Sequence, residues 1–178
     1  IKGKKIYKKY LNINNNQIPI INSKNQLIAN DSIQDIKKNY NNEIVIMAGG
    51  FGKRLKPLTN KIPKPMLKVN GIPILELIIN NFKNSGFNNF HISVNYKKDE
   101  IKKYFKKGKK FNANIEYIEE KKPLGTAGSL KLLKKKNKLP IIITNGDVLT
   151  KVNYENLLKF HQENNSDITV AIRELNYQ

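Results

Sequence analysis

Hydrophobic and polar positions follow two different periodicities along most of the chain. From residue 43 onward, short runs rich in β-branched residues are separated by stretches whose apolar residues recur at helical spacing. This alternation is typical of a parallel sheet whose strands are joined by crossover helices. The pattern therefore predicts an α/β domain, with strands near residues 44–48, 90–95, 114–118, 140–144 and 168–173.

Between these strands, three stretches carry apolar residues at helical intervals. Residues with this spacing share one face of a helix, so we expect each face to pack on the sheet. The expected helices include one that starts at Ser129 and one that starts at Asn153-Tyr154. The facing residues are Ile74, Leu75, Ile78, Ile79 and Phe82, then Leu130 and Leu133, then Leu157, Leu158 and His161.

Residues 1–42 do not continue this alternation of strand-like and helix-like segments. After a lysine-rich helical start they show apolar runs at 17–22 and 26–28, separated by a polar turn, and a capped helical pattern at 31–36. The stretch IPIINSKNQLIA resembles the core of the second half of a cystathionine-β-synthase (CBS) domain. The alternative is an N-terminal extension that packs on the main domain. In either case, residues 37–42 would form the linker.

The composition limits the classes of protein. A chain of 178 residues can bury one well-packed core. It has no cysteine, which excludes a disulfide scaffold and thiolate metal sites. It also lacks a long apolar run and a signal-peptide pattern at its start, so nothing indicates a membrane span or secretion. We therefore expect a cytoplasmic enzyme or binding domain with no membrane partner.

The formal net charge of +19 raises the alternative of a basic nucleic-acid-binding protein. However, Arg54 and Arg173 are the only arginines among 33 basic residues, and the lysine runs lack the interleaved aromatics that read bases. Heavy use of Lys, Asn and Ile is also expected from an AT-rich genome. We therefore interpret most lysines as solvated surface residues and expect no nucleic-acid partner.

A glycine cluster follows the first strand of the main domain, where residues 47–67 read MAGGFGKRLKPLTNKIPKPML. Glycines at a strand end let the backbone N–H groups approach a ligand, and Lys53-Arg54 directly after them favour an anionic one. The spacing does not fit a Walker A loop, because Met47 and Arg54 stand at two of its required positions. It does not fit the dinucleotide fingerprint either, which needs a glycine at Leu55.

The whole stretch resembles the signature of the sugar-1-phosphate nucleotidyltransferases, GGxGxRLxPLTxxxPKPMLxxxxxPILE. Two further blocks of that family follow in order, PLGTAG at residues 123–128 and NGD at residues 145–147. The resemblance covers residues 43–178. It implies a Rossmann-like, three-layer nucleotide-diphospho-sugar transferase fold with a mainly parallel sheet, as in mannose-1-phosphate guanylyltransferases and glucose-1-phosphate thymidylyltransferases.

This resemblance implies an activity in nucleotide-sugar biosynthesis for surface polysaccharide or glycan. A phosphate oxygen of a sugar 1-phosphate attacks the α-phosphorus of a nucleoside triphosphate, and pyrophosphate leaves. Such a reaction depends mainly on positioning and charge neutralisation. By resemblance, the nucleoside and its phosphates are held by the backbone of Ala48, Gly49, Gly50 and Gly52.

Two cations of the signature are expected to be catalytic. By resemblance, Arg54 stabilises the leaving pyrophosphate, for which a guanidinium offers a rigid donor fork that stays charged. Lys64 lies between Pro63 and Pro65, which restrict the backbone around it. In the family this lysine lies where it neutralises both the α-phosphate and the incoming sugar phosphate.

Asp147 follows Gly146 at the end of a predicted strand. In a parallel sheet this places it at the same edge as the glycine cluster, where ligands bind. A single carboxylate there suits Mg²⁺, which takes one or two carboxylates together with phosphate oxygens and water. The alternative, an N-cap of the helix near Asn153, is disfavoured because Asp147 lies too far before that helix.

The base is expected to meet the segment around residues 119–126. By resemblance, Gly125 and Thr126 present their backbone to the base or ribose, and the base-reading side chain of the family lies near Glu120. A carboxylate only accepts hydrogen bonds, which matches the two adjacent donors of guanine, whereas uracil or thymine suits an amide. Glu120 therefore favours guanine. The alternative is that Glu119-Glu120 are solvated glutamates that balance the lysines after them.

The chain ends at Gln178, where the family continues into strands that hold the sugar and a second metal-binding aspartate. We therefore expect a C-terminally truncated domain that binds a nucleoside triphosphate but does not transfer a nucleotidyl group on its own. An uncovered sheet edge would favour association. A CBS-type nucleotide sensor without catalysis is a further alternative. The sequence does not indicate which sugar is used or the oligomeric state.

Overall fold

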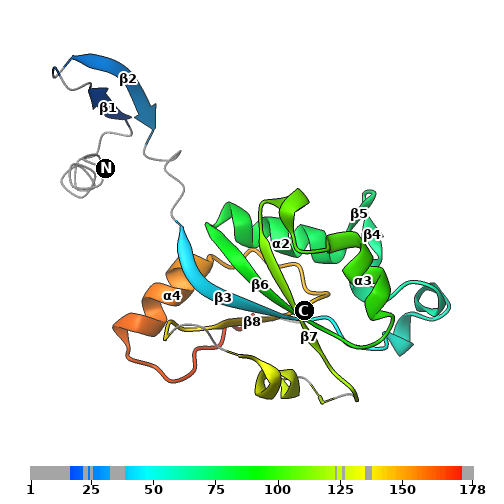
Figure 1. Ribbon diagram of the computed structural model, residues 1–178. Helices are drawn as coiled ribbons and strands as arrows, with labels where there is room; N and C mark the ends of the chain where they lie inside the picture. The colour runs from blue at the N-terminus through cyan, green and yellow to red at the C-terminus, as the bar shows by residue number, and fades with distance from the viewer. Residues whose placement is uncertain are drawn as a thin grey trace, which may run out of the picture. The chain divides into compact units, whose positions relative to one another are not determined.

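The computed structural model describes residues 17–21, 24, 26–32, 39–122, 124–125, 127–134 and 138–173 (Figure 1). Contacts divide the chain into two compact units, residues 1–38 and 39–178.

In the first unit, strands β1 (Gln17–Ile21) and β2 (Leu27–Ser32) pair antiparallel, which confirms both apolar runs as strands. The helix predicted from Asp31 is wrong at its start, because Asp31 and Ser32 pair with β1 as the last residues of β2. The backbone hydrogen bonds offered by the partner strand keep these two residues extended. The lysine-rich start and residues 33–38 lie outside the described residues.

The second unit is built on a parallel sheet of four strands in the order β7-β6-β3-β8. Strand β3 is central and almost entirely buried, which explains its continuous apolar run. Four of the predicted strands are confirmed. Residues 40–42, which the sequence placed in a linker, belong to β3. The strands are β3 (Tyr40–Met47), β6 (Phe87–Val94), β7 (Asn114–Glu119) and β8 (Ile142–Asn145), with a short separate hairpin of β4 (Lys68–Val69) and β5 (Ile72–Pro73).

The connections between the strands are helical. The helix predicted to start at Asn153-Tyr154 is α4, and Asn153 caps it by accepting a hydrogen bond from the backbone N–H of Asn156 (3.0 Å). The predicted helix at Ser129 is instead a 3₁₀ segment. The α-helices are α2 (Ile74–Asn84), α3 (Lys98–Phe105) and α4 (Tyr154–Glu163), and the 3₁₀ segments are η2 (Lys53–Leu55), η3 (Leu58–Asn60), η4 (Lys64–Met66), η5 (Lys109–Phe111) and η6 (Gly128–Leu132).

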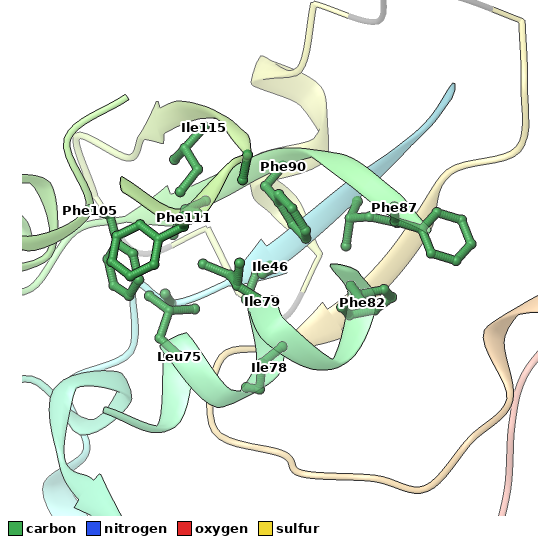
Figure 2. Packing of buried hydrophobic residues seen from close by; sticks show 14 of the residues in the cluster. Ile46, Leu75, Ile78, Ile79, Phe82, Phe87, Phe90, Phe105, Phe111 and Ile115 are labelled. Atoms are coloured by element: carbon green, nitrogen blue, oxygen red, sulfur yellow. The ribbon is translucent and has the colours of Figure 1, made fainter. Parts of the chain in front are cut away.

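The main core lies between the helices and one face of the sheet, with α2 and α3 running along that face (Figure 1). Figure 2 shows its aromatic centre, where the ring of Phe82 from α2 points at the sheet. This ring stacks on Tyr154 of α4 with centroids 3.9 Å apart and meets Phe87 edge-on at 6.0 Å. Phe82 therefore packs α2 against both α4 and β6.

On the opposite face of the sheet, η6 packs against β3 and β7. Successive residues of a strand point to opposite faces, so Met47 points away from the face that Ile46 buries against α2. Its sulfur accepts a hydrogen bond from the hydroxyl of Ser129 in η6, at 3.4 Å. The unit is thus layered on both faces of a parallel sheet, which confirms the predicted α/β class.

The predicted strand at 168–173 is wrong. These residues form no strand and are largely exposed, with Ile172 at 90%. A β-branched run becomes a strand only when it is hydrogen-bonded to a neighbour, and this segment pairs with none of the described strands. The outer edge of β8 likewise carries no strand there. None of the described helices is long and apolar enough to cross a membrane.

We predict that Phe82→Ala lowers the free energy of unfolding by about 3–5 kcal/mol, because it leaves a cavity where three elements meet. Phe160→Ala serves as the control, since Phe160 lies on α4 but is 56% exposed, and it should cost less than about 0.5 kcal/mol. Urea unfolding monitored by circular dichroism measures both. Equal losses would contradict the position of the core.

Candidate functional site

A cleft opens where the four parallel strands end. Met47, the last residue of β3, pairs with Ser93 on one side and Asn145 on the other, so the loops after all these strands leave from one edge. The cleft has a volume of about 620 Å³, within the usual range of small-ligand sites. It is lined by every predicted site residue except Thr126, which lies outside the described residues: Ala48, Gly49, Gly50, Gly52, Arg54, Lys64, Glu120, Gly125, Gly146 and Asp147.

Backbone hydrogen bonds fix the start of the glycine loop. The N–H of Ala48 donates to the carbonyl of Ser93 (2.9 Å), and the N–H of Gly146 donates to the carbonyl of Met47 (2.8 Å). These bonds continue the β6 and β8 pairings of β3 beyond its last residue. The loop therefore leaves a rigid strand end, and the β8 loop that carries Asp147 is tied to it.

Gly52 is required by its surroundings. It has a positive φ of 61° and closes the loop against the segment that carries Lys64. A Cβ atom at this position would lie 2.9 Å from Cγ2 of Thr59 and 3.1 Å from Cβ of Lys64. The hydroxyl of Thr59 also donates to the carbonyl of Gly52 at 3.0 Å, which holds the two segments at this close distance.

Tyr96 supports the loop through Thr59. Its hydroxyl donates to the carbonyl of Thr59 (3.1 Å), and its ring contacts Phe51 with centroids 5.3 Å apart. Sequence reasoning assigned no role to either residue. Thr59 lies inside the matched signature, which is a usable signal, whereas nothing in the sequence marks Tyr96.

The two cations of the signature both reach the cleft. Arg54 is exposed in η2 and lines it. Lys64 begins η4 between the buried residues Pro63 and Pro65, and its ammonium forms an ion pair with Asp147. The two side chains of this pair are partly exposed, at 36% and 28%. The predicted catalytic lysine and the predicted metal ligand thus lie in direct contact.

The acidic groups limit how a metal ion could be held. Within the described residues there is no group of three or more His, Cys, Asp or Glu that could form a metal cage. Asp147 provides one carboxylate at the cleft, beside space for a ligand. This donor set fits Mg²⁺ held partly by phosphate oxygens, because that ion commonly binds through one or two carboxylates together with its substrate.

The carboxylate of Glu120 is held at the cleft from two sides. The hydroxyl of Ser93 donates to Oε1, and the N–H of Leu124 donates to Oε2 at 3.1 Å. Its backbone is fixed too, since the side-chain amide of Asn95 donates to the Glu120 carbonyl at 2.7 Å. A Cβ at Gly49 would come within 3.1 Å of Oε1, so a glycine there leaves room for the carboxylate.

Glu119 differs from its neighbour. It points to the surface and pairs with Lys98 at 2.7 Å and Lys102 at 2.6 Å. Hydrogen bonds from Lys102 and Lys98, together with their charges, lower the pKa of Glu119 to about 2. Of the two adjacent glutamates, Glu119 is therefore the solvated one and Glu120 is the one that lines the cleft.

Comparison with known protein families matches residues 43–177 to the nucleotidyl transferase family. The chain belongs to this family. The match confirms the resemblance drawn from the three sequence blocks. It begins at residue 43, so the CBS resemblance of residues 1–42 receives no support from it and stays a prediction.

The relatives include mannose-1-phosphate guanylyltransferases. The enzyme of Aspergillus oryzae is 33% identical over 135 residues, which cover 74% of this chain and 37% of the relative. The enzyme of Mycobacterium tuberculosis is 34% identical over 131 residues, which cover 73% of this chain and 36% of the relative. The chain therefore spans little more than a third of the length of these relatives.

Solved structures show the same fold. HddC from Yersinia pseudotuberculosis, in complex with GMP-PN, superposes with a TM-score of 0.58 at 31% identity over 67% of this chain and 54% of that one. A UDP-glucose pyrophosphorylase in complex with UDP-glucose superposes with a TM-score of 0.57 over 70% of this chain and 54% of that one. Its identity is 17%, so this second likeness concerns the fold alone.

We predict that Gly52→Ala lowers the free energy of unfolding by about 1–3 kcal/mol, because it combines a positive φ with a contact too close for a methyl group. Gly50→Ala is the control, since a Cβ at Gly50 would have no atom within 4 Å and its φ is not positive. Thermal or urea unfolding compares the two variants. Equal stabilities would show that the loop has another conformation.

Proposed function

We propose that this cleft binds a nucleoside triphosphate together with Mg²⁺. We further propose that the chain provides this site in a nucleotidyltransferase that uses a sugar 1-phosphate and releases pyrophosphate. One observation carries the proposal. The glycine loop, Arg54, the Lys64–Asp147 pair and Glu120 follow three separate strands, β3, β7 and β8, and line one cleft.

The polar groups of the cleft fall into two sets, one that would bind the phosphates and one that would bind the base. In the first set, the loop after β3 offers backbone N–H groups, and Arg54 and Lys64 supply positive charge where a triphosphate is most negative. Asp147 would hold Mg²⁺, which when bound neutralises charge on the phosphate oxygens. Lys64 would then exchange its contact with Asp147 for a contact with the α-phosphate.

In the transfer step, an oxygen of the sugar phosphate forms a bond to the α-phosphorus, and the bond from that phosphorus to the β-phosphate oxygen breaks. Both electrons of the broken bond leave with pyrophosphate. Arg54 would stabilise the charge on this leaving group, and Lys64 would hold the two reacting phosphates together. Positioning and charge neutralisation of this kind supply most of the catalysis in phosphate transfer.

Guanine is the base that we propose. Its ring N–H and amino group are adjacent donors, and Glu120 presents a carboxylate, which only accepts. Two comparisons support this choice, because several relatives are mannose-1-phosphate guanylyltransferases and the structure of HddC is a complex with GMP-PN. Mannose 1-phosphate is accordingly the first sugar phosphate to test with GTP in a pyrophosphate-release assay.

We predict that Lys64→Ala and Arg54→Ala each weaken binding of Mg²⁺–GTP to this chain on the order of tenfold, since each removes a charge-assisted contact to phosphate. Isothermal titration calorimetry at fixed ionic strength measures the change. Lys61→Ala is the matched control, because Lys61 is exposed in the same loop and does not line the cleft. Equal weakening by all three variants would point to net charge rather than to specific contacts.

We also predict that Glu120→Gln shifts preference from GTP toward UTP or dTTP, because it replaces one acceptor oxygen with a donor. Competition binding against a labelled nucleotide ranks the triphosphates for both proteins. Glu119→Gln is the control at the neighbouring surface position. An unchanged ranking in Glu120→Gln would show that this side chain does not read the base.

A further inference from the structure

We infer that Ser93 determines nucleotide specificity, as a positioning residue that holds the carboxylate of Glu120 in its base-reading orientation. This inference rests on the proposed function and deepens it. Ser93 lies on β6 and is 0% exposed, so it cannot itself touch a nucleotide. Its effect must pass through the groups that it contacts.

Ser93 contacts both halves of the site. Its hydroxyl donates to Oε1 of Glu120, which follows β7, and its carbonyl accepts from the N–H of Ala48, which begins the loop after β3. Ser93 therefore links the residue that would read the base to the loop that would hold the phosphates. Replacing its side chain removes the first contact and leaves the second, because the second belongs to the backbone.

The carboxylate is held by two donors from two different elements. Ser93 occupies one lone pair of Oε1, and the N–H of Leu124, 3.1 Å away, occupies one lone pair of Oε2. A carboxylate has about four acceptor positions, so one remains on each oxygen. Two adjacent free acceptors match two adjacent donors on a base. Because the side chain is already ordered, little rotamer entropy is lost when the base binds.

Without the hydroxyl, this orientation is no longer fixed. In Ser93→Ala the Leu124 N–H holds only one oxygen, and the carboxylate can turn toward solvent, where water satisfies it. A base that depends on both oxygens then loses affinity, whereas a base that does not use Glu120 loses little. The ratio of affinities for two nucleotides should therefore fall, and a purely structural role of Ser93 would not change that ratio.

The test measures the affinities of the full chain for Mg²⁺–GTP and Mg²⁺–UTP by calorimetry. Ser93→Ala should reduce the GTP-to-UTP affinity ratio about tenfold, the scale of one hydrogen bond to a charged group. Ser129→Ala is the matched control, because Ser129 is equally buried and its hydroxyl bonds to Met47 instead. It should leave the ratio unchanged. In a Glu120→Ala background, Ser93→Ala should have no further effect on the ratio.

Each remaining outcome overturns a defined claim. If Ser93→Ala weakens both nucleotides equally while Glu120→Ala abolishes the preference, the inference is wrong and the base role of Glu120 stands. If the wild-type chain binds neither nucleotide or shows no preference, or if Glu120→Ala keeps the preference, the base role is wrong and the inference fails with it. Should Ser93→Ala not fold, Ser93→Cys replaces it, since a thiol is a much weaker donor of nearly the same size.

Discussion

Parallel pairing on both sides of β3 is the constraint on which the rest of the unit depends. Because β6 and β8 pair with β3 in parallel, Met47 at the end of β3 lies opposite both Ser93, one residue before the end of β6, and Asn145 at the end of β8. The sheet itself therefore brings together the polar residues that follow these strands. The buried core on the helical face holds the strands in place, so the loops start from fixed points.

The strength of this constraint explains which parts could be predicted from sequence. The buried strands carry long apolar runs and were located correctly, although their ends shifted by a few residues because strand ends are set by the partner. The segment at 168–173 has the same composition, but a strand also needs a neighbour, which composition does not report. At η6, the spacing of Leu130 and Leu133 suits a 3₁₀ turn as well as an α-helix, so periodicity could not separate them.

At the site, the motifs identified residue types and their order but not their contacts. Each predicted residue within the described part of the chain lines the cleft, since the blocks follow strands that end at one edge. The Lys64–Asp147 ion pair and the Ser93–Glu120 hydrogen bond join residues that lie far apart in the sequence, where no local pattern signals a pairing. The role of Tyr96 could not be predicted for the same reason, because it depends on a contact with Thr59 in the segment that follows another strand.

The Lys64–Asp147 pair has a consequence for what can enter the cleft under the proposed function. In this structure each charge of the pair is matched by the other. A divalent ion alone would compete with an ammonium for Asp147, and an unchelated triphosphate would compete with a carboxylate for Lys64. A magnesium–triphosphate chelate carries a cation for Asp147 and an anion for Lys64. The two side chains can therefore exchange their mutual contact for contacts with the chelate at the same time, and neither charge is left unpaired. By linkage, metal and triphosphate then raise each other's affinity by the same factor, and the cleft favours the magnesium chelate over either component.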